Sequence, residues 1–232
     1  MNLLGLDFET SGLSPENDLI LEVGAVIWDT DLHVPIAIDN FFVNWGIDVS
    51  EEITEINGIQ QRFLDDHGLD PLFALNRLGL LEDKTEITVA HNGNLFDRPF
   101  RREWNKRLLP QPPADDRLWI DTHVDLDYPD KVATRRLTYL AAEHGFLNPF
   151  AHRAVFDVLT MLVILDKYPL EEVIFSAKQP TVLVQALVSY DNRQLAKDNF
   201  FYWDGEKKAW LRSMKKHKLE QVKFPFNHRI VG

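Results

Sequence analysis

The chain has 232 residues, which is enough for one α/β domain with a sizeable core and a small appendage. Its net charge of −11 argues against a broad electrostatic grip on nucleic acid, although metal ions would supply positive charge at an acidic site. Cysteine is absent, which excludes disulfides and thiolate zinc sites. The longest apolar run, residues 158–165, is far shorter than the roughly 20 residues that span a bilayer.

The first predicted element is a buried strand at residues 3–10 that carries two acids. Side chains alternate along a strand, so Asp7 and Glu9 share one face with Gly5. Two buried carboxylates repel each other and lose water, which is costly without cations or donors. A divalent metal is the simplest remedy, and oxygen ligands suit Mg²⁺ or Mn²⁺. The alternative is an acid pair on a solvated edge, which is common in acidic chains.

Two further strands are predicted at residues 18–29 and 35–45, with Gly24 as a bulge or a point of close approach. Turn residues at 11–17 join the first two strands, which predicts an antiparallel pair. A meander of three strands is not the pattern of a dinucleotide-binding domain, and the glycine-rich phosphate-binding motifs are absent from the sequence.

Helices and short strands alternate over the following residues. Ser50 begins a helix that breaks at residues 56–59, and its first turn is acidic. The remaining predicted elements are one or two helices at 60–81, strands at 86–90 and 118–121, and helices at 96–107, 136–144 and 152–167. This order predicts an α/β fold whose mixed sheet carries helices on both faces.

Three more polar residues fall where α/β domains place ligand sites. Asp97 follows a strand at a helix start, although an acid there also simply favours the helix dipole. Asp157 lies in a helix too apolar for the surface, and such a helix rarely carries an unpaired acid. His152 is rotated from Asp157 by about 140° and follows Pro149, so we expect it at the helix entry or on the preceding loop. Taken alone, His152 is better interpreted as an ordinary helix N-terminal residue with no chemical role.

Taken together, these residues resemble the DEDD exonucleases, in the DnaQ-like subclass with a catalytic histidine (DEDDh). The motifs that carry the resemblance are residues 7–13, 91–97 and 152–157, supported by the stretches 56–59 and 137–146. The resemblance extends from residue 3 to about 167.

This sequence departs from many family members at two points. Three residues separate the His91–Asn92 pair from Phe96, where many bacterial members have two. Asn57 stands where a histidine often precedes Gly-Ile. Neither departure removes a metal ligand, but the second affects how a terminal nucleotide is held.

The resemblance implies a ribonuclease H-like mixed β-sheet and hydrolysis of phosphodiester bonds from the 3′ end, which releases nucleoside 5′-monophosphates. It implies that two Mg²⁺ or Mn²⁺ ions, about 3.5–4 Å apart, are held by four acids. These are Asp7, Glu9, Asp97 and Asp157. His152 is implied as the general base that takes a proton from the attacking water.

The resemblance also implies contacts with the terminal nucleotide. They fall on Thr10, Leu13, Asn57, His91, Asn92 and Phe96. Leu13 and Phe96 are equally interpretable as core residues.

The expected substrate is a nucleic acid with a free 3′ end, with single-stranded DNA favoured, in proofreading or DNA repair. A polymerase or repair protein is a candidate partner, and a membrane is not. Two alternatives stay open: an exoribonuclease of the same family, because discrimination at the 2′-hydroxyl depends on pocket geometry, and an accessory protein that binds nucleic acid or a polymerase.

With no basic and apolar leader before the first strand, we expect a cytoplasmic protein, or one associated with a nucleoid or viral DNA, that is not secreted.

The sequence predicts an exonuclease domain at residues 1–179 and a small α+β module at 180–232. From residue 181 onward seven lysines and three arginines outnumber three aspartates and two glutamates, a net charge of +5. After a helix at 170–178 we expect a strand at 181–189, a helix at 192–197 and a hairpin at 200–213 that turns at Asp204. Its aromatic and basic residues suit stacking on single strands. An aromatic mini-core and a protein-docking surface are the competing interpretations.

Overall fold

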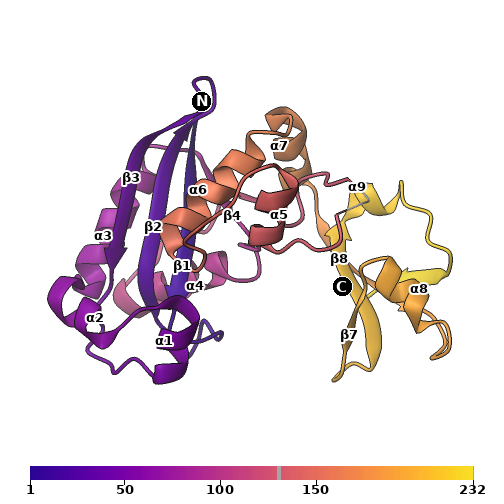
Figure 1. Ribbon diagram of the computed structural model, residues 1–232, viewed down its shortest axis with the longest axis horizontal. Helices are drawn as coiled ribbons and strands as arrows, with labels where there is room; N and C mark the ends of the chain where they lie inside the picture. Colours follow the sequence, from indigo (N-terminus) through magenta and orange to yellow (C-terminus); the bar gives the residue numbers. More distant parts are fainter. Residues whose placement is uncertain (130–131, 232) are drawn as a thin grey trace. The chain divides into compact units, whose positions relative to one another are not determined.

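Five strands form a mixed sheet in the first part of the chain (Figure 1). The computed structural model describes residues 1–129 and 132–231. β1 (Asn2–Thr10), β2 (Ile20–Asp29) and β3 (Val34–Phe42) are the predicted antiparallel meander, and β4 (Ile87–Ala90) and β5 (Leu118–Asp121) continue it in parallel. The order β3-β2-β1-β4-β5 makes β1 the central strand, so its acids lie in the middle of the sheet.

Helices cover both faces of this sheet, as predicted. They are α1 (Glu51–Asn57), α2 (Gln61–His67), α3 (Pro71–Glu82), α4 (Asp97–Leu108), α5 (Leu137–Glu143) and α6 (Ala154–Leu165). The largest core cluster joins Leu6 and Phe8 of β1 to α3 and α4, and Phe8 meets Trp104 edge to face at 6.3 Å. α6 packs on β1 and β2 from the opposite face, and α5 packs against α6.

Local sequence signals set the helix ends. Ser50 caps α1 by accepting a hydrogen bond from the Ile53 N–H, and Gly58, with φ of 72°, ends that helix in the left-handed region. Asp70 caps α3 in the same way, with proline at the first helical position. Within the described ranges 1–129 and 132–231, none of the helices combines the length and the apolar character needed to cross a bilayer.

Two glycines allow α6 to lie directly on the sheet. A Cβ atom at Gly24 would lie 2.3 Å from the carbonyl carbon of Ala154, and one at Gly5 would lie 2.6 Å from Cγ1 of Val158. The close approach predicted at Gly24 is therefore confirmed. The start of α6 lies against the strands that carry the acids, because no side chain intervenes at these two positions.

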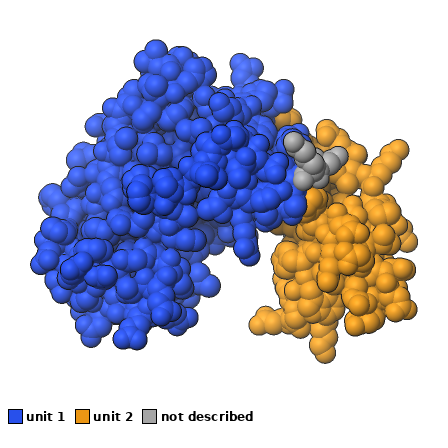
Figure 2. All heavy atoms as spheres, viewed as in Figure 1, with its two compact units in different colours: residues 1–174 blue, residues 175–232 orange. Residues whose placement is uncertain are grey.

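The chain divides into two compact units, Met1–Ile174 and Phe175–Gly232 (Figure 2). This division lies before the expected boundary at 179/180, within α7 (Leu170–Lys178). The second half of α7 belongs to unit 2 because the Phe175 ring meets His217 at 5.5 Å and the Lys215 ammonium donates to the Ala177 carbonyl. That residues 180–232 act as a separate module remains a prediction.

Unit 2 contains a four-stranded antiparallel sheet in the order β7-β8-β6-β9. Its elements are β6 (Thr181–Leu187), α8 (Arg193–Asp198), β7 (Tyr202–Asp204), β8 (Ala209–Lys215), α9 (Lys216–Leu219) and β9 (Asn227–Ile230). The predicted hairpin is confirmed as β7 and β8. α9 and β9 were not predicted from the sequence, because each is only four residues long and carries no clear apolar periodicity.

Candidate active site

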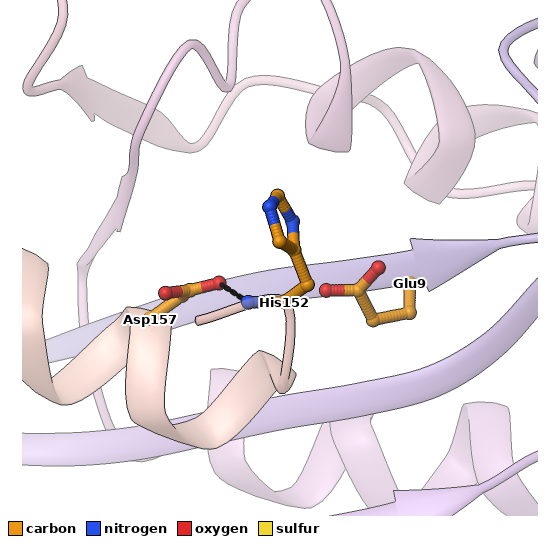
Figure 3. A group of neighbouring side chains, drawn as sticks. All are labelled: Glu9, His152 and Asp157. Atoms are coloured by element: carbon orange, nitrogen blue, oxygen red, sulfur yellow. Dashed lines mark hydrogen bonds between the residues drawn. The ribbon is translucent and has the colours of Figure 1, made fainter. Parts of the chain in front are cut away.

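Glu9, His152 and Asp157 come together at the junction of β1 and α6 (Figure 3). One possible ligand atom from each lies within 4.8 Å of those of the other two. Glu9 is the penultimate residue of β1, Asp157 lies in the first turn of α6, and His152 precedes that helix. In Figure 3 the His152 residue lies between the two carboxylates. Residues 143 positions apart in the sequence therefore share one site.

Two hydrogen bonds attach the loop before α6 to the Asp157 carboxylate. Oδ2 of Asp157 accepts a hydrogen bond of 2.9 Å from the His152 backbone N–H, and Oδ1 of Asp157 accepts one of 2.6 Å from the Asn148 side-chain amide. His152 has φ of 63°, a left-handed conformation that non-glycine residues rarely adopt. The histidine lies on the loop before α6, as expected, and its side chain is exposed.

Asp97, at the start of α4, also lies against β1. It is the first residue of α4, is only 1% exposed, and its Oδ1 accepts a 3.0 Å hydrogen bond from the Phe8 N–H. Phe8 separates Asp7 from Glu9 along the strand, so this bond holds Asp97 against the two strand acids. The Asp7 carboxyl is close enough to Asp97, Glu9 and Asp157 for their negative charges to disfavour its ionisation.

Burial and mutual repulsion make these carboxylates hard to ionise. Burial, followed by the charges of its acidic neighbours, raises the pKa of Asp7 well above its ordinary value. The pKa of Glu9 rises to about 8 through burial and the charges of Glu22, Asp157 and Asp97. Burial raises the pKa of Asp97 to about 8 and also raises that of Asp157. Added cations would allow the four groups to be ionised together near neutral pH.

A partly buried ion pair that was not predicted from the sequence supports this cluster. Glu22 on β2 stands opposite Glu9 in the strand register and is 0% exposed. Its carboxylate accepts hydrogen bonds of 2.9 Å from the Arg153 guanidinium and from the Asn40 amide. Arg153 directly follows His152, so the pair ties the histidine loop to the sheet. An acid near the start of the otherwise apolar strand at residues 20–28 was the signal that could have revealed this pair.

Asp121 is a second missed residue, and it shapes the turn that leads to Asp97. The side chain is 2% exposed and accepts hydrogen bonds from the backbone N–H groups of Asn92 (2.8 Å) and Asn94 (3.1 Å). Asn92 itself has φ of 62°. Asp121 ends the buried strand β5, beside β4, and an acid at the end of a buried parallel strand was the available signal.

Leu13 and Phe96, two of the expected nucleotide contacts, have different surroundings. Leu13 is 84% exposed, which excludes the core interpretation for this residue. Phe96 packs against the core and meets Phe100 at 4.9 Å between ring centroids.

The other expected contacts take part in internal hydrogen bonds. Asn57 is 3% exposed and its Oδ1 accepts from the Ile59 N–H, which stabilises the turn after α1. Thr10 donates from Oγ1 to the Gly12 carbonyl at 2.5 Å. The two ring nitrogens of His91 bond to Thr122 Oγ1 and to the Arg135 carbonyl, and burial lowers its pKa to about 4. Their contact with a nucleotide stays a prediction.

The five-stranded mixed sheet flanked by helices has the ribonuclease H-like fold. Residues 4–165 match the family model described as exonuclease, and residues 182–229 match a domain of unknown function. The chain therefore belongs to the exonuclease family, in its DnaQ-like 3′–5′ branch, as the sequence resemblance predicts.

Relatives in sequence and structure agree with this assignment. The chain is 33% identical over 154 residues to the DNA polymerase III PolC-type of Thermotoga maritima, a match that covers 66% of this chain and 10% of that protein. It is 26% identical over 188 residues to the oligoribonuclease of Corynebacterium efficiens, covering 72% and 76% of the two chains. E. coli Exonuclease I in complex with a dT13 oligonucleotide shares the fold, with a TM-score of 0.65 at 18% identity over 80% of this chain and 48% of that chain. The chain thus spans a tenth of the polymerase and about half of the solved exonuclease.

Proposed function

We propose that this chain is a metal-dependent 3′–5′ exonuclease that hydrolyses single-stranded nucleic acid, preferentially DNA, and releases nucleoside 5′-monophosphates. The observation that carries the proposal is the gathering of Asp7, Glu9, Asp97 and Asp157 beside His152, with raised pKa values at all four acids. The solved Exonuclease I, which shares the fold, was crystallised with a single-stranded DNA oligonucleotide, and the PolC-type relative is a DNA polymerase. A polymerase or repair protein is therefore the partner we propose.

The donor set fits divalent cations of the Mg²⁺ or Mn²⁺ type. It offers carboxylate oxygens, and the cost of ionising them together is the cost that bound cations remove. Asp7, Glu9, Asp97 and Asp157 would hold two such ions. When bound, they supply the positive charge that lowers the pKa of water and stabilises charge on the phosphate and leaving oxygens.

His152 has the placement of a general base. Its backbone is held by Asp157, whereas its ring is exposed and lies beside the Glu9 carboxylate (Figure 3). In the proposed step a ring nitrogen takes a proton from water and the water oxygen bonds to phosphorus. The bond between phosphorus and the 3′-oxygen breaks, the terminal nucleotide leaves as a 5′-monophosphate, and the new 3′-oxygen gains a proton.

The terminal nucleotide is proposed to contact the surface around the end of β1. Leu13 offers an exposed apolar side chain to a base. Phe96 and Thr10 would line the site, whereas Asn57, His91 and Asn92 shape the neighbouring turns through their own hydrogen bonds and backbone conformation.

A second candidate is an exoribonuclease that uses the same residues. It is favoured by the oligoribonuclease relative, whose sequence is matched over 76% of its length, far more than the polymerase. Because the chemistry is identical, the two candidates differ only in whether the nucleotide site accommodates or excludes the 2′-hydroxyl.

One experiment tests hydrolysis and ranks the substrates. The purified protein is incubated with Mg²⁺ and 5′-labelled single-stranded DNA or RNA of one sequence, with EDTA and Asp7→Ala as tests of the site. Asp65→Ala, an exposed acid of α2, is the matched control. We expect ladders that shorten from the 3′ end with wild type and control only. A ladder that survives EDTA or Asp7→Ala would contradict the proposal.

A further inference from the structure

Unit 2 contains a cavity of about 470 Å³ that the exonuclease site does not explain. It is lined by residues 185–190, at the end of β6 and in the following loop, and by Trp203 and residues 208–210 of the β7–β8 hairpin. All of these residues lie in the region that matches a domain of unknown function.

Three aromatic side chains line this cavity, those of Tyr190, Trp203 and Trp210. Trp203 and Trp210 are opposite each other in the β7–β8 register, with ring centroids 5.5 Å apart at an angle of 58°. Trp203 is 52% exposed and Tyr190 is 77% exposed. Leaving such large rings in water forgoes the stabilisation that burying them would give, so their exposure around one cavity indicates a binding surface.

The core of unit 2 does not require these exposed rings. Phe201 is 3% exposed and meets Phe224 and Phe226 at 5.2 and 5.5 Å, and the last two stack on each other at 5.3 Å. These rings belong to the core cluster of unit 2, against which the partly buried Trp210 also packs. An aromatic mini-core therefore exists without Trp203 and Tyr190, which leaves those two side chains available for a ligand.

Cations surround the exposed rings. The Arg193 guanidinium lies 4.0 Å from the centroid of Tyr190, the Lys197 ammonium lies 5.9 Å from that of Trp210, and Lys208 lines the cavity. Among residues 1–129 and 132–231, no carboxylate forms an ion pair with Lys208. The exposed acids Asp191 and Glu206 lie nearby in sequence.

The charge of the whole unit has the same sign. Over residues 175–232, eight lysines and three arginines outnumber three aspartates and two glutamates, a net charge of +6. The complete chain carries −11, so unit 1 carries −17. A polyanion is therefore attracted to unit 2 and repelled by unit 1 where metal ions are absent.

We propose that this cavity binds unpaired bases of single-stranded nucleic acid, by stacking on Trp203 and Tyr190 while Lys208 and Arg193 contact the phosphates. Every base presents a flat π-face, so a site of this kind tolerates sequence and prefers single strands to duplexes, whose bases are already stacked. The proposal concerns binding alone and does not depend on hydrolysis by unit 1. It makes unit 2 the part that retains long strands.

The test uses the full chain in EDTA, so that no strand is cut. Fluorescence anisotropy measures binding to a labelled oligothymidylate of about 16 nucleotides, to the same length of oligouridylate and to a duplex. Trp203→Ala is expected to weaken single-strand binding about tenfold or more, and Trp203→Phe to retain most of it. Lys208→Ala is expected to reduce the slope of log binding constant against log salt concentration by about 0.7, the value for one phosphate contact.

Tyr202→Ala is the matched control, because Tyr202 is 53% exposed and precedes Trp203 on β7, so its side chain points to the opposite face. It is expected to bind like wild type. Circular dichroism confirms that each variant is folded. Equal losses in Trp203→Ala and Tyr202→Ala, or binding unchanged in every variant, would overturn the proposal, and the second result would favour a protein ligand for the cavity. A protein that binds strands but never cuts them would contradict only the proposed exonuclease function.

Discussion

The acid cluster should make the metal-free protein less stable as the pH rises from 6.5 to 8. Burial raises the pKa of Asp97 from 3.8 to about 8, so the folded chain keeps a proton there that the unfolded chain has lost. Stability falls with pH wherever the folded state binds more protons. Asp97 is only 1% exposed, and 1.5 pH units at about 1.4 kcal/mol each give a loss of about 2 kcal/mol from this group alone.

Two buried histidines explain why stability should be measured above pH 6.5. Burial lowers the pKa values of His91 and His123 to about 4, so between roughly pH 4 and 6.5 the unfolded chain binds protons that the folded chain does not. Over that lower range the histidines increase stability as the pH rises, which opposes the carboxylates. Above pH 6.5 each histidine adds only about 0.4 kcal/mol more, so the larger decline due to the acids dominates.

The assay is urea denaturation in EDTA at several pH values between 6.5 and 8. Asp97→Asn should flatten the decline, because the amide oxygen still accepts the hydrogen bond from the Phe8 N–H but carries no charge. Asp65→Asn is the control, and added Mg²⁺ should remove the decline in wild type because ligand binding stabilises the folded state. A wild-type stability that is constant or rising over this window would refute the reasoning.

Two further predictions concern the histidine and the helix that carries Asp157. His152→Ala should lower turnover at least about 100-fold while Mn²⁺ affinity, measured by calorimetry, changes little; a large loss of Mn²⁺ binding would make His152 a ligand instead. Gly24→Ala should destabilise the protein by about 1–3 kcal/mol in urea denaturation, because its methyl group would meet the backbone of Ala154. Gly79→Ala in α3, where a Cβ meets nothing within 4 Å, is the control and should be neutral or stabilising. An undiminished stability of Gly24→Ala would mean that α6 shifts away without cost.

Much of unit 1 was predictable because its signals are local. Turn residues between two apolar runs predicted the β1–β2 pair, and a capping serine with a terminal glycine predicted α1. The candidate site was predictable for a different reason. Acids in an apolar strand and an apolar helix are unfavourable without a compensating partner, so Asp7, Glu9 and Asp157 were conspicuous in the sequence.

The supporting contacts were not predictable in the same way. Glu22 and Arg153 are 131 positions apart, and no local pattern indicates which cation meets a buried acid. Asp121 acts through backbone N–H groups of a turn in another segment, which the sequence does not mark. The ends of unit 2 were missed because β9 and α9 are short and polar, so tertiary contacts decide their conformation.

The acids of the candidate site come from β1, α4 and α6, so the site requires these three elements of unit 1 to be packed together. A molecule in which α6 has not docked over Gly5 and Gly24 lacks Asp157 and the His152 loop at this position. Loss of α6 alone would separate the helix from the strand acids while leaving most of the sheet paired. The candidate site therefore forms only after α6 has docked on the sheet, and it is lost when α6 undocks. The proposed hydrolysis of nucleic acid is in this way limited to molecules whose unit 1 is folded.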